Sequence, residues 1–371
     1  MIVPAKPFIE SIPFHYRHTE DYVPPWSDVI FFQSGREAII AALDKLKVPR
    51  GSSIVLPALI CNSVPEILVR YGFNPLFVDS ATESPFPQQK KILQTIHEND
   101  DVRAVLVVNY FGFFDNDCCQ LNAVLRQVGC VLIEDRCHSS LSSRQESHGC
   151  QADAIIYSIR KSLISSDGGA LWLRSQRKRK VELPIMHWYR DILFSLSRFA
   201  ERVVCELGWP NIYSKSITKL RKNNTLTLLS QDECIPVPVR STAPSWFLSL
   251  QLKNKKLLDS VIEYRCNNYL HLEESIRRCG LTPLFNQLDA GVVPQVLPVL
   301  DVIGGLVEYL RENGVVAYRW PGEEMPGFVL ESSRSFHNAI RLNQEVVCLP
   351  VHQSIRNRHI YHMINLIEKW L

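Results

Sequence analysis

The sequence predicts an α/β fold, in which helices flank a mainly parallel central sheet and a smaller α+β domain follows at the C-terminal end. Short apolar runs alternate with amphipathic stretches from residue 30 to residue 173, which is the pattern of strands separated by helices. Beyond residue 240, long helical patterns are mixed with a few short apolar runs. We therefore expect a large α/β domain over residues 1–240 and a small α+β domain over residues 241–371.

The predicted strands of the large domain are short apolar runs with few charges. They lie at Ser53–Pro57, Asn74–Val78, Ala104–Asn109, Val131–Glu134, Ala154–Ser158 and Ala170–Leu173. Apolar residues at helical spacing between them predict helices over Gly35–Leu46, Asn62–Tyr71 and Asp117–Val128. Strands that alternate with helices favour a parallel sheet covered on both faces, and the ligands of such sheets gather at the carboxyl ends of the strands.

A different pattern follows residue 173. A dense basic run comes first, with Arg174, Arg177, Lys178, Arg179 and Lys180. An amphipathic stretch over Trp188–Leu207 then carries on one side Ile192, Leu193, Leu196, Phe199, Val203 and Val204. This stretch is either a membrane-surface helix beside a basic anchor or a helix that packs on the core or on a second subunit. We favour packing, because such helices are common in large enzymes. The polar, then Pro-containing stretch over residues 214–239 predicts a linker or a mobile loop.

The small domain is predicted from longer periodic segments. Residues Ser245–Gly280 have the spacing of one long helix. Apolar runs predict strands at Val293–Leu300, Val315–Ala317 and Val347–Val351, and helical spacing predicts helices over Val302–Asn313 and His359–Leu371.

The composition is ordinary for a globular protein. Of the 371 residues, 46% are apolar and 21% charged, and the net charge is only +3. So small a charge does not favour nucleic acid as a partner. No apolar run approaches the ~18 residues that a membrane-spanning helix needs, and the amino terminus lacks the apolar region of a signal peptide. We expect a cytoplasmic protein without nucleic acid or stable membrane insertion.

The 11 cysteines are odd in number and scattered through a long chain. Without a sign of secretion, this distribution predicts free thiols and no disulfide framework. One region holds several possible zinc ligands, which are Cys130, Cys137, His138, His148 and Cys150. The region has no Cys-x-x-Cys pair, and two of its candidate ligands are adjacent in sequence, so we predict no metal site.

Two residues with acid–base chemistry follow predicted strands. Asp135 comes directly after the apolar run Val131–Glu134, and Lys161 lies three residues after Ser158. A carboxylate and an amine at neighbouring strand ends are what a pyridoxal phosphate (PLP) site needs, because the lysine binds the cofactor aldehyde and the aspartate pairs with the ring nitrogen. A helix-capping aspartate and a surface lysine are the ordinary roles of these residue types, so the pair alone leaves both interpretations open.

Other segments offer groups that could complete such a site. Gly35 and Arg36 open a predicted helix, whose free N–H groups suit a phosphate, although Ser-Gly is also a common helix cap. Ser158 offers a hydroxyl group. The pair Gly168-Gly169 indicates a backbone that turns sharply or passes close to another segment. Cys61 follows another strand end and could line one face of the cofactor.

The segment around the lysine resembles a known motif. The string Ser158…Lys161…Asp167-Gly168-Gly169 is similar to the lysine motif of the DegT/StrS family of PLP-dependent, fold-type I sugar aminotransferases. Residues 133–135 with His138 resemble the family's Ile-Glu-Asp motif, which carries Gln or His three residues after the Asp. Weaker likeness covers most of the chain, through residues 51–79, 109–112, 265–269 and 348–352.

The chain departs from the family at two candidate positions, so it resembles a divergent branch. Gly35-Arg36 stands where the family usually has Gly-Thr, and the Arg36 guanidinium could pair with the phosphate in place of the hydroxyl. Cys61 stands near the position where the family usually places an aromatic ring over the cofactor.

The resemblance implies the PLP-dependent transferase fold type I and transfer of an amino group to a keto sugar nucleotide. Glutamate is the expected amino donor, and the product would serve polysaccharide, lipopolysaccharide or secondary-metabolite sugar biosynthesis. Lys161 is implied as the catalytic acid and base, Asp135 as the partner of the ring nitrogen and His138 as a neighbour of the phenolic oxygen. Related sugar dehydratases have His in place of the lysine, so Lys161 favours transamination.

The resemblance also implies a homodimer with the site at its interface. Basic residues that could reach a nucleotide diphosphate there are Lys215, Lys219, Arg221 and Lys222. Two alternatives stay open: another PLP-dependent reaction on a small amino acid, and a non-catalytic regulatory or scaffold protein with the same fold. A nicotinamide dehydrogenase is disfavoured, because no Gly-x-Gly-x-x-Gly follows a strand.

Overall fold

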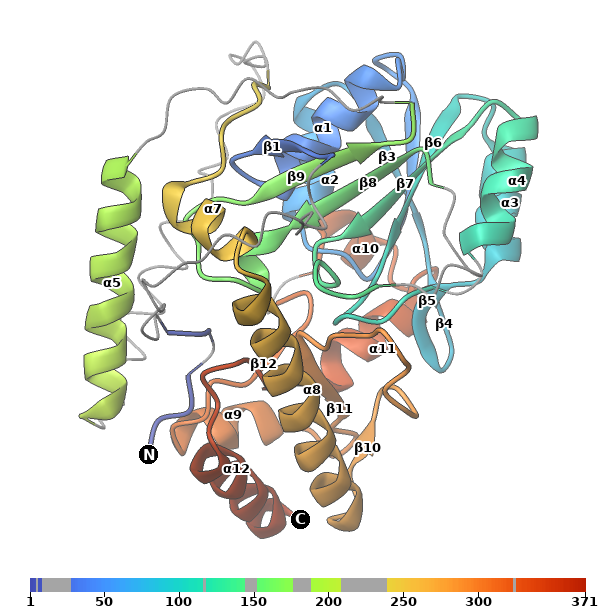
Figure 1. The fold of residues 1–371 in the computed structure, drawn as a ribbon. Coiled ribbons are helices and arrows are strands. Elements are labelled where there is room, and N and C mark those ends of the chain that lie inside the picture. The colour runs from blue at the N-terminus through green and yellow to red at the C-terminus, as the bar shows by residue number, and fades with distance from the viewer. Residues whose placement is uncertain are drawn as a thin grey trace.

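A computed structural model describes residues 1–4, 6–8, 28–115, 118–143, 152–175, 188–207, 239–322 and 325–371. A seven-stranded sheet lies in the first part of the chain, and a four-stranded sheet lies near the C-terminal end (Figure 1). Helices flank the larger sheet, as the sequence predicts.

The large sheet is mostly parallel, with one opposed strand. Its order is β1-β9-β8-β7-β6-β2-β3, and the run from β8 to β3 is parallel throughout. The strand β9, which follows the proposed lysine segment, is antiparallel to both β8 and β1. The bounds are Ile30–Phe32 (β1), Ser53–Pro57 (β2), Asn74–Val78 (β3), Val102–Val108 (β6), Val131–Arg136 (β7), Ala154–Ser158 (β8) and Gly169–Leu173 (β9).

Alternate residues of the central strands pack against helices on opposite faces of the sheet. Ile54 and Leu56 belong to the core that includes helices α1 and α2, whereas Val55 belongs to the core that includes α3 and α4. This alternation follows from the two-residue period of a strand, and burial on both faces explains why the strands are nearly continuous apolar runs. The helices are Gly35–Lys45 (α1), Ser63–Arg70 (α2), Gln89–Glu98 (α3) and Cys118–Gln127 (α4). A small hairpin, β4 (Ser80–Ala81) and β5 (Ser84–Pro87), precedes α3.

The predicted single helix over residues 245–280 is wrong, because the chain forms two helices there. They are α7 (Trp246–Leu252) and α8 (Lys255–Arg278). The backbone of Asn254 is extended, and its side chain accepts a hydrogen bond from the Leu257 N–H at 3.0 Å. An asparagine in this role caps a new helix and competes with continuation of the previous one.

The C-terminal unit consists of the four-stranded antiparallel sheet and its helices. Its strand order is β10-β11-β13-β12, with bounds Thr282–Pro283 (β10), Val296–Leu300 (β11), Tyr318–Arg319 (β12) and Val346–Pro350 (β13). The helices are Leu306–Glu312 (α9), Gly327–Glu331 (α10), His337–Glu345 (α11) and Asn357–Trp370 (α12).

Two predicted elements of the C-terminal unit are displaced. The predicted strand at residues 315–317 is wrong, because Val315 makes only an isolated bridge with Val3 and the sheet strand begins at Tyr318. The helix predicted from residue 302 begins at Leu306. The Asp301 carboxylate accepts hydrogen bonds from the N–H groups of Gly304 and Leu306, both at 2.9 Å, and so holds a turn before the helix.

The boundary near residue 240 stays a prediction. Helix α7 and the start of α8 follow that boundary, yet they pack on the large sheet. Leu248, Leu252 and Leu258 share a core with Ile159 and Ala170. The C-terminal part of the chain therefore reaches the end of β8, where Lys161 lies.

Helix α5 (Trp188–Glu206) forms as predicted, but most of its apolar side is exposed. The exposed fractions are 49% for Ile192, 64% for Leu193, 60% for Leu196, 64% for Phe199 and 36% for Val203, whereas Val204 packs against buried neighbours. The other side is anchored, because Asp191 accepts from the Phe247 N–H at 3.3 Å and Arg198 donates to the Pro7 carbonyl at 2.9 Å. The prediction that this apolar side packs on the chain's own core is therefore wrong. Packing on a second subunit and binding to a membrane surface stay predictions.

Several sequence features lie outside the described residues. They are Arg177–Lys180, His148, Cys150 and the basic residues Lys215, Lys219, Arg221 and Lys222. Within the described ranges, no helix is both long enough and apolar enough to cross a membrane.

The exposed side of α5 gives a testable prediction for stability. Leu196→Gln should change the free energy of unfolding by less than about 0.5 kcal/mol, because an exposed side chain loses little when it becomes polar. Leu248→Gln, the matched control, should cost roughly 2–5 kcal/mol, because Leu248 is fully buried. Denaturant unfolding at two protein concentrations measures both. A large, concentration-dependent loss for Leu196→Gln would contradict exposure and place a second subunit on this side.

Candidate active site

The predicted pair Asp135 and Lys161 lies at the carboxyl edge of the large sheet. Asp135 is the fifth residue of β7 and pairs in register with Ile156 of the neighbouring parallel strand β8. A single turn of 3₁₀-helix, Ile159–Lys161, follows β8 and carries the lysine. Because parallel strands end at the same edge, the carboxylate and the amine reach the same region.

Electrostatic effects show that Lys161 lies beside the segment after β7. Burial and then the charge of Lys161 lower the pKa of His138 well below its ordinary value. Burial and then the charge of Asp135 raise the pKa of the Cys137 thiol well above its ordinary value. The Cys137 N–H also donates to Asp135 Oδ1 at 2.8 Å. The structure thus gathers a carboxylate, a protonated thiol, a neutral imidazole and an amine.

His138 is held as a neutral hydrogen-bond donor. The Phe111 N–H donates to His138 Nδ1 at 3.4 Å, so the proton of the neutral ring is on Nε2. Phe111 has a φ of 58°, in the left-handed region that bulky residues avoid, and this turn directs its N–H to the imidazole. The two rings also stack, with centroids 5.8 Å apart.

The amino end of α1 packs directly on the ends of β7 and β8. A Cβ added to Gly35 would lie 2.9 Å from Cys137 Sγ and 3.7 Å from Ser158 Cβ. A Cβ added to Gly169 would lie 2.2 Å from the Ser34 carbonyl carbon, a distance that no side chain tolerates. The close approach expected at this glycine pair is therefore present, and it joins β9 to the start of α1.

Two guanidinium groups lie near the start of α1. Burial and then the charge of Arg36 lower the pKa of Arg160, so the two guanidinium groups lie close enough to repel each other. The charge of Arg36 also lowers the pKa of Glu66, although burial raises that pKa overall. Ser158 precedes the lysine turn without capping it. The free N–H groups of a helix start beside two cations and a hydroxyl have the chemistry to bind an anion.

Asp167 ties the segment after Lys161 to helix α7. Its carboxylate accepts from the Ser165 hydroxyl at 2.7 Å and from the Ser245 N–H at 2.9 Å. Gln251 of α7 binds the same segment, because its amide donates to the Ile164 carbonyl at 2.7 Å and accepts from the Ile164 N–H at 3.2 Å. The segment after the lysine turn is therefore held at both ends of helix α7.

Arg265 of α8 joins this segment to the C-terminal unit. The side chain is buried and donates to the main-chain oxygens of Ser162 at 3.0 Å, Pro294 at 3.2 Å and Gln295 at 3.3 Å, and to Gln353 Oε1 at 3.1 Å. Burial lowers its pKa to about 10, so the guanidinium stays charged at neutral pH. The sequence indicated Arg265 only as part of a helix, because its acceptors are distant in the chain.

Trp320 is a site residue that the sequence analysis missed. It follows β12, and its ring centroid lies 5.5 Å from Lys161 Nζ and 4.2 Å from the His138 centroid. Its signal in the sequence was a Trp-Pro pair, which by itself predicts only a turn.

Cys61 is not brought to this cluster by any contact of the described residues. Its Sγ lies 3.2 Å from the Ser63 hydroxyl, at the start of α2, and the residue is half-buried. Its place against a cofactor stays a prediction. No group of metal-ligating side chains occurs within the described residues.

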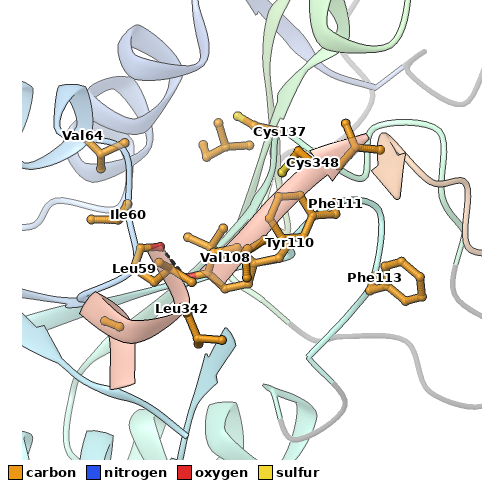
Figure 2. Packing of buried hydrophobic residues seen from close by; sticks show 14 of the residues in the cluster. Leu59, Ile60, Val64, Val108, Tyr110, Phe111, Phe113, Cys137, Leu342 and Cys348 are labelled. Carbon is orange, nitrogen blue, oxygen red and sulfur yellow. Dashed lines mark hydrogen bonds between the residues drawn. The ribbon is translucent and has the colours of Figure 1, made fainter. Parts of the chain in front are cut away.

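An apolar wall lies beside the cluster. Tyr110, at the end of β6, is fully buried and donates its hydroxyl to the Leu59 carbonyl at 2.7 Å (dashed line in Figure 2). Burial raises the pKa of Tyr110 well above its ordinary value. Figure 2 shows Tyr110 beside Phe111, with Cys137 near them. The wall keeps water from this side of the site.

The Arg265 contacts predict a loss of stability when the guanidinium is removed. Arg265→Met should lower the free energy of unfolding by about 2–4 kcal/mol, because buried carbonyl oxygens lose their donors. Arg278→Met on the same helix is the control and should change it by less than about 0.5 kcal/mol, because that side chain is 75% exposed. Urea unfolding measures both variants, and equal effects would contradict the joining role of Arg265.

One family model matches the first half of the chain. The DegT/DnrJ/EryC1/StrS aminotransferase family matches residues 19–184, which include the strand ends, the start of α1 and Lys161. A search of curated proteins gave no match.

Solved structures resemble nearly the whole chain. The aminotransferase TlmJ from Streptoalloteichus hindustanus is 19% identical, with a TM-score of 0.66 over 92% of this chain and 85% of that one. The putative sugar aminotransferase Spr1654 from Streptococcus pneumoniae, solved in PMP and PLP forms, is 13% identical in its PMP form, with a TM-score of 0.67 and the same coverage. A DegT DnrJ EryC1 StrS aminotransferase from Brucella abortus is 16% identical, with a TM-score of 0.63 over 92% and 85%.

Likeness at these identities establishes the fold, so the predicted fold-type I architecture is confirmed. The matched segment holds the motifs around Asp135 and Lys161. Over residues 19–184, this chain resembles the DegT/DnrJ/EryC1/StrS aminotransferase family.

Proposed function

We propose that this chain is a PLP-dependent aminotransferase that transfers an amino group from an amino acid to a keto sugar nucleotide. The observation that carries the proposal is the meeting of Asp135 and Lys161 at one sheet edge, beside an anion site at the start of α1. The match of residues 19–184 to an aminotransferase family and the likeness to sugar aminotransferases support it.

The donor set at this edge fits the four reactive parts of PLP. The free N–H groups of α1 at Gly35, with Arg36 and Ser158, suit the phosphate. The buried Asp135 carboxylate suits the protonated ring nitrogen. The neutral His138, with its proton on Nε2, suits the phenolic oxygen. The Lys161 amine suits the aldehyde.

When bound, PLP withdraws electrons from the carbon that carries the amino group. The protein's own part is to hold the groups and move one proton. Asp135 supplies a negative charge from a rigid strand, and the Cys137 N–H fixes its orientation. Lys161 takes a proton from the substrate carbon and returns it, as a general acid and base. The wall of Tyr110 and Phe111 excludes water from this transfer.

The finer parts of the proposal rest on the motifs and on the family. Lys161 favours transamination over the dehydration performed by related enzymes with His at this place. Glutamate is the proposed amino donor, and sugar biosynthesis for a polysaccharide, lipopolysaccharide or secondary metabolite is the proposed pathway. We also propose a cytoplasmic homodimer with the site at its interface.

The cofactor assignment predicts a spectrum. Purified protein supplied with PLP should show the visible absorbance of lysine-bound cofactor, and Lys161→Ala should lack it, because Lys161 is the amine that the proposal assigns to the cofactor aldehyde. Lys256→Ala, an exposed lysine on α8, is the control and should keep the absorbance. Absence of the band from the wild type would support the non-catalytic alternative, which Arg36 and Cys61 motivated.

The reaction assignment predicts a half-reaction. Wild-type protein loaded with PLP should convert glutamate to 2-oxoglutarate once per site, with loss of the visible band, because Lys161 can move the proton that this exchange needs. Coupled detection of 2-oxoglutarate measures it. No keto acid from any amino acid would contradict transamination, and release of carbon dioxide or ammonia would favour the other PLP reactions.

A further inference from the structure

Trp320 is held in place by the C-terminal unit. Its main-chain oxygen accepts a hydrogen bond from the Asn343 side chain at 3.0 Å, and the same amide donates to the Gly322 carbonyl at 3.0 Å. Asn343 is buried on helix α11. The turn after β12 therefore has a fixed backbone, and the position of the indole is built into the fold.

The indole faces the reactive groups of the large sheet. Its ring meets His138 edge-to-face, at 4.2 Å between centroids and an angle of 78°, and lies edge-to-face with Phe111 at 6.1 Å. Lys161 Nζ lies 5.5 Å from the same ring. An amine at this distance is within the range of a cation–π contact. Trp320 thus bounds Lys161 on the side of the C-terminal unit.

The indole nitrogen has no acceptor among the described residues. Trp320 Nε1 is buried and makes no hydrogen bond to them. The nearest imidazole offers none, because His138 Nδ1 already accepts from Phe111 and Nε2 carries the proton. A buried indole N–H usually finds an acceptor, and one left unpaired is destabilising. An acceptor brought by a ligand would remove this cost.

We propose that Trp320 is a substrate-contacting residue, whose N–H donates to an oxygen of the substrate held at Lys161. The inference rests on the proposed function. In the proposed function, the cofactor is not the expected acceptor, because Arg36, Ser158 and His138 would donate to its phosphate and phenolic oxygens. Both substrates offer an oxygen that can accept this hydrogen bond. It is a carboxylate oxygen in the amino donor and a sugar oxygen in the amino acceptor.

The test compares Trp320→Phe, which keeps a ring and loses the N–H, with Trp320→His, which keeps a ring N–H. Trp370→Phe is the matched control, because Trp370 packs on Tyr309 and Gly305 in the C-terminal unit. The first arm measures the KM and the saturating rate of the glutamate half-reaction. The second arm measures, by calorimetry on cofactor-free and on loaded protein, binding of UDP-glucose, dTDP-glucose and GDP-mannose.

Trp320→Phe should raise either the KM for glutamate or the dissociation constant of the nucleotide sugars by roughly threefold to tenfold, as loss of one hydrogen bond does. The saturating rate should stay within about twofold, because the N–H holds the substrate and does not move the proton. A higher KM for glutamate identifies the donor carboxylate as the acceptor. Weaker binding of the nucleotide sugars identifies an oxygen of the sugar. Trp320→His should retain more affinity than Trp320→Phe.

Unchanged values in both arms, or equal losses in the Phe and His variants, would overturn the proposal. The unfolding free energy and the visible band of each variant separate a binding defect from a folding defect. Failure of the proposed function gives a different result, because the wild type itself would then lack the band and release no 2-oxoglutarate. The calorimetry on cofactor-free protein still tests Trp320 in that case.

Discussion

The buried guanidinium of Arg265 is the interaction on which the rest of the site depends. Its donors reach Ser162, directly after the lysine, and Pro294, Gln295 and Gln353 in the C-terminal part of the chain. Each acceptor is a neutral oxygen, so the charge is stabilised by directed dipoles and by no carboxylate among these partners. Because Trp320 belongs to the C-terminal unit and Lys161 to the other part, this side chain joins the two parts directly beside the reactive amine, and hydrogen bonds to Ser142 and Asp79 join them farther away.

Close backbone packing fixes the opposite end of the site. Gly169 lets β9 touch the Ser34 carbonyl, and Gly35 lets α1 touch Cys137 and Ser158. These contacts bring the free N–H groups of α1 to the ends of β7 and β8. The anion site and the acid–base pair are therefore parts of one rigid edge, and a side chain at either glycine would separate them.

The sequence predicted what depends on local period and on strand order. The strands ending at Asp135 and Ser158 are parallel neighbours, so their polar ends had to share an edge. It could not predict features set by distant contacts. The opposed direction of β9 depends on its pairing with β1. The helix break at Asn254 depends on competition between a cap and continuation of the helix. The position of Trp320 depends on how the C-terminal unit packs against the large sheet. The exposure of α5 likewise depends on which of its sides is anchored.

The two departures from the family motif have counterparts in the structure. Where the family has a hydroxyl, Arg36 stands near Arg160, so the anion end holds two guanidinium groups and a stronger positive field than one hydroxyl supplies. Where the family has an aromatic ring, Cys61 contacts Ser63 at the start of α2, and the indole of Trp320 reaches Lys161 from the C-terminal unit. A ring from that unit approaches Lys161 from the C-terminal side, whereas a ring after β2 would approach from the large sheet. In the proposed function, this change would place substrate recognition in the segment after β12, where the N–H of Trp320 has no acceptor among the described residues.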